Sequence, residues 1–292
     1  MSDFVQQQDT VCEFSTSDSW VILSPIEQSI KRKIEAVGTP LKDWDIQINY
    51  GIKTGCNEAF IINTAKRNEI LANCQTEEER KRTAELIRPI LRGRDIKRYG
   101  YVDNVLYLIN THNGIRGKLP RIDINDYPAV KTHLDHYWDR IASRADKGDT
   151  PYNLRNCAYL EDFNKPKIIF QEIVQSSQFM YDETTHYMCN DTGRIIVGSH
   201  LPFVLGVLNS KLFFYAVKKF YGGGVLGEHG IRMKHTFFGN FPCLPYNQQI
   251  EDVAKELSNN NSANVVDKTD ELVFSAYSLS REEIAIIQED SM

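Results

Sequence analysis

The chain has 292 residues, of which 41% are hydrophobic and 11% aromatic, and 34 Lys and Arg against 39 Asp and Glu give a formal charge of −5. This much apolar surface excludes wholesale disorder and provides a core for one large or two ordinary domains. The mild acidity argues against a protein that is held to nucleic acid by bulk charge alone.

No stretch reaches the roughly 18 uninterrupted apolar residues of a membrane helix, and the first 14 residues have neither the basic start nor the apolar core of a secretory signal. We therefore expect a cytoplasmic protein. The six cysteines are 18 to 83 residues apart, and none stands at the C-x-x-C spacing of a zinc site. We predict free thiols without chemistry, and no metal ligands.

The charge is unevenly distributed. Residues 1–20 have a local charge of −4 and residues 250–292 a local charge of −7. Subtracting both from −5 leaves +6 for residues 21–249, so the body of the chain is basic. The acidic C-terminal segment is a candidate for a surface that faces away from an anionic partner.

The first predicted element is a helix that starts at Ser24. Ser24 can cap the open N–H groups, Pro25 suits the first helical position and Glu27 completes a capping box. The apolar stripe continues to about Val37, where Gly38 ends the helix.

A strand is predicted next, because polar and apolar residues alternate over Asp45–Tyr50. Glu58–Ile62 can return as a second strand across the Gly51–Asn57 connection. This pattern predicts a β-hairpin with a long loop.

Thr76–Glu79 is a second capping box, and it predicts a basic helix that is interrupted near Pro89. Between Arg80 and Arg98 the chain has eight basic residues against two acidic ones, its densest positive run. A strand over Val105–Asn110 and a helix that starts at Asp126 are expected to follow.

The middle of the chain reads as three short strands, Lys167–Ile173, Gln178–Tyr181 and Arg194–Gly198. The mostly apolar Leu201–Tyr221 predicts a buried helix. Three further helical patterns follow, over Gln248–Leu257, over Asp267–Tyr277 and after a Ser280 cap. The order of elements predicts an α+β fold with helices clustered at both ends of a strand-rich centre.

Tests for catalytic motifs are negative. Gly222–Gly227 matches G-x-G-x-x-G, but it follows a helix instead of a strand, so we interpret it as a loop. Glu85, Asp95 and Lys97 have the outline of a Mg²⁺-dependent nuclease, although the arginines around them suit phosphate contact better. No Asn-Pro-Pro-Tyr type tetrapeptide, nucleophile elbow or Walker loop is present. We expect no catalytic residue in this chain.

Binding chemistry is more prominent, because cations recur on loops beside glycines and aromatic residues, from which they can reach phosphates or base edges. Five clusters in a body of charge +6 point to DNA contact. The clusters are Lys53–Thr54 between two glycines, the Arg80–Arg98 run, Arg116, Lys118 and Arg121 near Asn113–Gly114, Lys147–Gly148 with Tyr152 and Arg155, and Arg232, Lys234 and His235.

Seven segments, each weak alone, occur in an order that resembles the TaqI-like C-terminal specificity domain of adenine-specific DNA methyltransferases and of Eco57I-like type II restriction-modification enzymes. The resemblance extends over roughly 20–288. The segments are Trp20–Pro25 (WVILSP), Pro40–Ile46 (PLKDWDI), Gly51–Phe60 (GIKTGCNEAF), Leu91–Ile96 (LRGRDI), Thr150–Tyr152 (TPY), Lys165–Ile169 (KPKII) and Leu208–Leu212 (LNSKL).

The resemblance implies a target-recognition core that reads double-stranded DNA and presents it to a companion methyltransferase domain. There the adenine would be flipped out and methylated at N6 with S-adenosylmethionine. A nuclease domain, where present, would need Mg²⁺. We expect neither cofactor in this chain, and divide it into an acidic N-terminal segment (1–19), a DNA target-recognition domain (20–246) and an acidic C-terminal helical segment (247–292).

We assign DNA contact on this basis, with three groups of residues in different roles. One group would contact the backbone or guanine, a second would form a loop near a groove, and a third would form the opposite rim. The groups are Arg92, Arg94, Lys97 and Arg98, then Lys53, Thr54 and Asn57, then Arg232, Lys234 and His235; Lys147, Tyr152 and Arg155 complete the candidate DNA-binding residues.

Three alternatives remain open. The chain could be the specificity half of a type I system, an interaction module whose acidic helices dock a methyltransferase subunit, or a self-contained Mg²⁺-dependent nuclease that uses Glu85, Asp95 and Lys97. The recognised bases are set by three-dimensional placement and DNA shape, which the sequence does not give.

Overall fold

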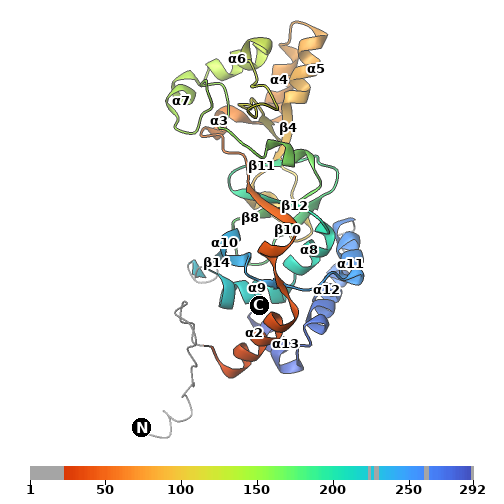
Figure 1. The fold of residues 1–292 in the computed structure, drawn as a ribbon. Coiled ribbons are helices and arrows are strands. Elements are labelled where there is room, and N and C mark those ends of the chain that lie inside the picture. Colours follow the sequence, from red (N-terminus) through yellow and green to blue (C-terminus); the bar gives the residue numbers. More distant parts are fainter. Residues whose placement is uncertain (1–22, 223–224, 227–229, 260–262, 291–292) are drawn as a thin grey trace. The chain divides into compact units, whose positions relative to one another are not determined.

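A computed structural model describes residues 23–222, 225–226, 230–259 and 263–290 (Figure 1). The predicted N-terminal segment 1–19 and Cys12 lie outside these residues. Packing divides the chain into two compact units. Unit one comprises the described residues of 1–45, 173–177 and 202–292, and unit two comprises 46–172 and 178–201. The acidic segment predicted to begin at residue 247 is therefore a part of unit one.

Unit two contains a four-stranded antiparallel sheet in the order β10-β8-β12-β2, a second sheet in the order β11-β4-β7-β3, and the small β5-β6 hairpin. Its strands are β2 (Ile46–Tyr50), β3 (Ile61–Asn63), β4 (Ile87–Leu91), β5 (Ile96–Lys97), β6 (Gly100–Tyr101), β7 (Leu106–Ile109), β8 (Lys167–Gln171), β10 (Phe179–Asp182), β11 (Met188–Cys189) and β12 (Gly193–Gly198).

Helices α4 to α7 gather at the end of unit two that is distant from β8, β10 and β12 (Figure 1). Most of the apolar side chains of the unit form one buried cluster. The helices and 3₁₀ turns are α3 (Asn57–Phe60), α4 (Thr64–Ala72), α5 (Glu77–Leu86), η2 (Gly93–Asp95), η3 (Ile124–Asp126), α6 (Pro128–Asp135), α7 (Trp138–Ser143) and η4 (Leu160–Asn164).

Unit one is mainly helical, with two small sheets, β1-β15 and β13-β14-β9. Its elements are α2 (Pro25–Val37), β1 (Thr39–Pro40), η1 (Leu41–Asp43), β9 (Ile173–Val174), α8 (Leu201–Leu208, whose first residue belongs to unit two), α9 (Lys211–Ala216), η5 (Val217–Tyr221), β13 (Val225–Leu226), β14 (Gly230–Arg232), α10 (His235–Phe238), β15 (Pro242–Cys243), α11 (Gln248–Asn259), α12 (Ala263–Ala276) and α13 (Arg281–Glu289). The predicted α+β class is confirmed.

Helix α2 begins and ends where the sequence predicts. The Glu27 N–H donates to Ser24 Oγ, and the Ser24 N–H donates to Glu27 Oε2 at 2.8 Å, so the capping box is complete. Ile30 and Ile34 are fully buried, one helical turn apart. The same device starts α13, where Ser280 and Glu283 form the box.

The predicted hairpin of Asp45–Tyr50 with Glu58–Ile62 is wrong. Strand β2 pairs with β12, about 150 residues away, with Ile46 opposite Gly198 and Tyr50 opposite Arg194. The chain stays against this region after the strand, because the Gly51 N–H donates to the Gly193 carbonyl. The expected return strand forms α3 and β3 instead, and β3 pairs with β7.

The three predicted central strands are confirmed as β8, β10 and β12, and β8 pairs with both of the others. Lys167 begins β8 opposite Asp182 at the end of β10, and both side chains are buried. Lys167 Nζ lies 2.7 Å from Asp182 Oδ2 and donates to the Phe163 carbonyl at 3.0 Å. Burial lowers the pKa of Lys167, and the Asp182 carboxylate opposes this shift in part. The second lysine of the KPKII segment is therefore part of the core.

The predicted helix Leu201–Tyr221 is buried, as expected, but it is broken. Ser210 caps the start of α9, and the axis bends by 64° between α8 and the Lys211–Tyr221 segment. No single helix in the described ranges is long and apolar enough to cross a membrane. The two helices of this bent pair reach that length and apolar composition only when they are taken together.

The acidic C-terminal segment folds as α11, α12 and α13, and several of its carboxylates are paired within unit one. Lys33 Nζ lies 2.7 Å from Glu283, and Lys218 Nζ lies 2.9 Å from Asp290. The Lys211 N–H donates to Asp270. Part of the local charge of −7 is thus neutralised by contacts that hold the helices in place.

The cysteines Cys56, Cys74, Cys157, Cys189 and Cys243 are free, as predicted. Burial raises the pKa of Cys189 to about 12 and that of Cys157 to about 11. A high thiol pKa disfavours the reactive thiolate.

Candidate nucleic-acid interface

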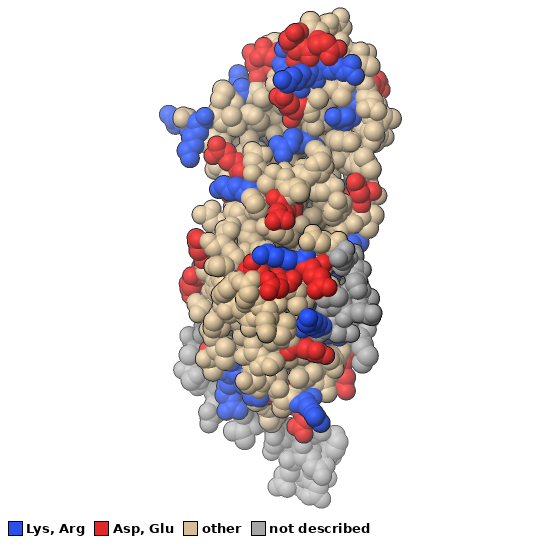
Figure 2. Space-filling view, turned by 90° about the vertical axis from the view of Figure 1, so that its right-hand side faces the viewer, with Lys and Arg blue, Asp and Glu red and all other residues tan. Residues whose placement is uncertain are grey.

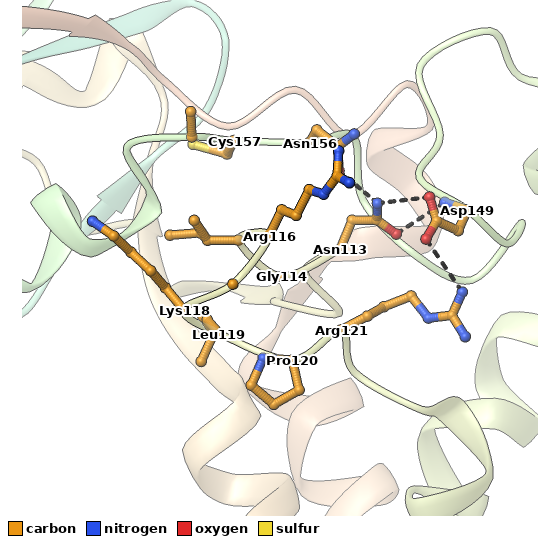
Figure 3. A pocket seen from close by; sticks show the side chains of 13 residues that line it. Asn113, Gly114, Arg116, Lys118, Leu119, Pro120, Arg121, Asp149, Asn156 and Cys157 are labelled. Carbon is orange, nitrogen blue, oxygen red and sulfur yellow. Dashed lines mark hydrogen bonds and ion pairs between the residues drawn. The ribbon is translucent and has the colours of Figure 1, made fainter.

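A surface cavity of about 830 Å³ in unit two is formed by one loop and its neighbours (Figure 3). The loop closes on itself, because the Ile115 N–H donates to the Leu119 carbonyl at 2.8 Å and the Leu119 N–H donates back at 2.9 Å. Gly117 lies at its tip with φ +77. Arg116 and Lys118 flank the tip; both are exposed, and neither forms an ion pair within the described part of the chain.

A side-chain network supports this loop. Asn113 Nδ2 donates to Asp149 Oδ1 at 3.0 Å and to Asn156 Oδ1 at 2.5 Å, while the Asp149 N–H donates to Asn113 Oδ1 at 2.9 Å. Arg121 lies 3.4 Å from the other Asp149 oxygen. Lys118 and Arg121 extend in opposite directions from the loop (Figure 3). We name Arg116, Lys118 and Arg121 the basic loop.

Two glycines of this loop allow a matched prediction. Gly114 and Gly117 share a left-handed backbone, at φ +75 and +77, but a Cβ on Gly114 would lie 2.4 Å from the Leu119 carbonyl oxygen, whereas one on Gly117 would meet open space. We expect Gly117→Ala to lower the free energy of unfolding by about 1 kcal/mol, the cost of the left-handed backbone. Gly114→Ala should cost more, because the main chain must also shift. Urea unfolding of both variants measures the difference, and equal losses would contradict the crowding argument.

A second group of cations surrounds Asp146. Lys53 Nζ lies 2.8 Å from Asp146 Oδ2, and Arg155 lies 3.1 Å from Oδ1. Hydrogen bonding to Lys53 lowers the pKa of the Asp146 carboxyl despite some burial. The exposed Lys147 donates to the Ala142 carbonyl. The structure thus brings Lys53 together with Arg155, which the sequence placed in separate clusters.

Thr54 and Asn57 bond to one another rather than facing solvent together. Thr54 is 1% exposed, its Oγ1 donates to Asn57 Oδ1 at 2.5 Å and it accepts from the Cys56 N–H at 3.3 Å. These bonds shape the turn that leads into α3. They favour a structural role for Thr54, while Lys53 remains at the surface.

Tyr152 belongs to an aromatic surface that the sequence analysis recognised only in part. Its hydroxyl donates to Asp135, its ring lies 5.4 Å from the Trp138 ring, and Lys131 Nζ lies 5.4 Å from its centroid. Trp138 is 45% exposed. An exposed indole beside a cation can stack on a base or a sugar. Trp138 was missed because the binding candidates were chosen around cations on loops, and Trp138 stands within a predicted helix.

Arg92 is engaged inside unit two. Its Nε and Nη2 donate to the two carboxylate oxygens of Asp95, each at 2.9 Å. Asp95 is buried, which alone would raise its pKa, but the Arg92 and Asn104 hydrogen bonds outweigh burial and lower the pKa of the carboxyl. This geometry favours a structural role for Arg92, in contrast to its predicted DNA contact. Arg94 and Lys97 are exposed.

Arg98 completes the predicted run and lies beside Tyr99, with its guanidinium carbon 5.7 Å from the ring centroid. Arg232, Lys234 and His235 belong to unit one, at the end of β14 and the start of α10. Lys234 Nζ lies 5.4 Å from the Phe237 ring. The other ten predicted residues all belong to unit two.

The structure argues against the nuclease alternative, because Asp95, its central carboxylate, already accepts hydrogen bonds from Arg92 and Asn104. A metal ion would have to displace Arg92 and Asn104 from Asp95. Glu85 lines a separate cavity of about 290 Å³ in which Asp95 takes no part. The described residues contain no group of three or more side chains that could hold a metal ion.

The charge on one face of the molecule is mixed. On the face shown in Figure 2, Lys and Arg side chains are interspersed with Asp and Glu, and neither sign forms a continuous field. Local groups such as the basic loop are therefore better candidates for specific contact than a bulk electrostatic surface.

Comparison with known proteins gives the context of this site. Residues 88–225 match the family model of the TaqI-like C-terminal specificity domain. The fold is similar to that of the type IIL restriction-modification enzyme MmeI, solved in complex with DNA, with a TM-score of 0.60 and 16% identity over 87% of this chain and 36% of that one.

The type IIG restriction endonuclease BpuSI is also similar, with a TM-score of 0.50 and 15% identity over 91% of this chain and 32% of that one. The chain thus spans about a third of the length of each enzyme. At these identities the two structures establish the fold alone. The family match covers residues 88–225, so this part of the chain is similar to the TaqI-like C-terminal specificity domain.

Proposed function

We propose that this chain is the sequence-specific DNA recognition module of a restriction-modification enzyme. The observation that supports it best is a coincidence of position: the residues lining the 830 Å³ cavity, from Asn113 to Ala158, fall entirely within the matched range 88–225. The basic loop then lies in the part of the chain that defines the family. Arg116 and Lys118 would contact phosphates, and the Asn113 and Asn156 amides face the same cavity.

The finer assignment follows the resemblance. The companion part of the enzyme would be an adenine-N6 methyltransferase that binds S-adenosylmethionine, with a Mg²⁺-dependent nuclease in type II enzymes of the fused kind, acting on DNA in the cytoplasm. MmeI and BpuSI are each about three times as long as the part that this chain matches, which is consistent with such companions. By the same resemblance, both cofactors would bind in those companion domains.

Selection from a random duplex library tests the proposal. Repeated capture by the intact chain should enrich a short common motif, and affinity for that motif should exceed affinity for random duplex by about 10³-fold or more. A salt titration should give a negative slope of log K against log salt. Binding without an enriched motif would contradict a specificity module, and cleavage of the duplex with Mg²⁺ alone would instead support the nuclease alternative.

A further inference from the structure

The most unusual surface of unit two is the segment Tyr101–Val105, which we name the apolar tip. It begins at Tyr101, the last residue of the β5-β6 hairpin, in which Ile96 pairs with Tyr101 and Lys97 with Gly100. Three of its five side chains are large, apolar and exposed: Tyr101 at 43%, Val102 at 50% and Val105 at 45%. Large exposed apolar patches mark contact surfaces, and three such side chains within five residues make this segment a candidate for one.

The backbone of the tip is strained. Val105 has φ +47 and Tyr99, in the turn before the tip, has φ +60. A left-handed conformation is a genuine outlier for a β-branched residue such as valine. Strain of this kind persists only where the surroundings enforce it, and it is concentrated at functional sites.

Hydrogen bonds enforce the conformation. The Val105 N–H donates to Asp103 Oδ1, and Asn104 Nδ2 donates to Asp95 Oδ1, both at 2.7 Å. The Val102 N–H donates to the Asp95 carbonyl at 2.7 Å. The Tyr101 ring also packs edge-on against Tyr187, with centroids 4.9 Å apart. These contacts connect the tip to Asp95 and Tyr187 and favour one conformation of it.

Cations stand next to the tip. Arg94 and Lys97 are both exposed, and Lys97 Nζ donates to the Arg94 carbonyl at 3.0 Å, which holds the ammonium beside the hairpin. Asp103 is the acidic residue of the tip, and its carboxylate already accepts the Val105 N–H. Apolar groups flanked by cations complement a surface on which apolar groups are flanked by phosphates.

We infer that the apolar tip reads thymine C5-methyl groups in the major groove of the target. This inference rests on the proposed function and names a specificity determinant within it. The major groove admits a two-stranded β-ribbon, and there the thymine methyl is an apolar feature that distinguishes an A·T pair. Val102 and Val105 would cover the methyl groups while Arg94 and Lys97 contact the flanking phosphates. Valine is too short to separate stacked base pairs as larger wedge residues do.

Deoxyuridine substitution tests the inference, because it removes the methyl group and leaves base pairing unchanged. In the target selected above, each thymine is replaced in turn and the dissociation constant is measured with the intact chain. We expect at least one position at which affinity falls about fourfold, which is the effect of losing the burial of one methyl-sized group. In Val102→Ala or Val105→Ala the ratio of the affinities for the thymine and deoxyuridine duplexes should fall toward one.

The outcomes separate the inference from the proposed function. If the unsubstituted chain shows no sequence-specific binding, both the proposed function and the tip inference are overturned. Specific binding that is indifferent to deoxyuridine at every position, or a thymine preference unchanged in both valine variants, would overturn the tip inference alone and leave the surface to a protein partner. Val37→Ala is the matched control, since Val37 is 39% exposed at the end of α2.

Discussion

Replacing Lys167 with alanine is expected to lower the free energy of unfolding by about 3–5 kcal/mol. The side chains of Lys167 and Asp182 are 0% and 2% exposed, so the substitution leaves a carboxylate in the core without its counter-charge. Asp182 also accepts the N–H groups of His186 and Tyr187, at 3.1 and 2.9 Å, and these bonds fix the turn after β10. Loss of the Lys167 side chain should therefore destabilise the turn after β10 and the central sheet, in addition to removing the ion pair.

Lys165 provides the control within the same KPKII segment. Its side chain is 59% exposed, and it pairs with Asp162 at 2.7 Å. Pairs at such exposed positions contribute little to stability, so Lys165→Ala should be nearly neutral. Replacing both Lys167 and Asp182 by apolar residues of similar volume should recover much of the loss. Urea unfolding followed by circular dichroism compares the variants; equal losses in Lys165→Ala and Lys167→Ala would disprove the role of the buried pair.

Local signals in this sequence predict local structure well. The capping boxes at Ser24 and Ser280 mark the true starts of α2 and α13, because the bonds that define them span only three residues. The central strands were predictable for a similar reason, since apolar runs between polar turns are complete within a few residues.

Non-local pairing explains the failures. The extent of strand β2 was predicted correctly, but its partner was not. Its alternating pattern indicates a half-buried strand and does not indicate that β12 pairs with it. Lys167 appears in the sequence as one more cation. Its burial depends on Asp182, which stands opposite only after β8 and β10 pair. Charge clusters counted along the chain cannot separate surface cations from buried ones.

The candidate DNA-binding residues show the same contrast between local and non-local signals. Lys53 and Arg155 share Asp146 although about 100 residues separate them, so their proximity was not predictable from spacing. Thr54 and Arg92 were chosen for their residue types, and the structure directs both into internal contacts. The basic loop gave a usable signal, since Asn113-Gly114 and Gly117 predict tight turns, with Arg116 between them and Lys118 directly after.

Removing Arg116 and Lys118 together is expected to weaken DNA binding by about 60-fold at 0.1 M salt, because each phosphate contact contributes about 0.9 to the slope of log K against log salt. The slope itself should fall by about 1.8. Arg121→Ala should have a smaller effect, since Asp149 already lies 3.4 Å from its guanidinium. Filter binding at 50, 100 and 200 mM salt, roughly the range in which such contacts are resolved, gives both quantities.

The control must remove the same charge from a different place. Lys31→Ala with Lys42→Ala does so in unit one, where Lys31 pairs with Glu35 at 3.8 Å and Lys42 bonds Asn240 at 3.0 Å. If net charge alone drives binding, the two double variants will lose affinity equally, and the basic loop has no special part in recognition. If the loop contacts phosphates, only Arg116→Ala with Lys118→Ala will reduce the salt slope. Because phosphate contacts read no bases, that variant should retain the preference for the selected motif over random duplex while binding both more weakly.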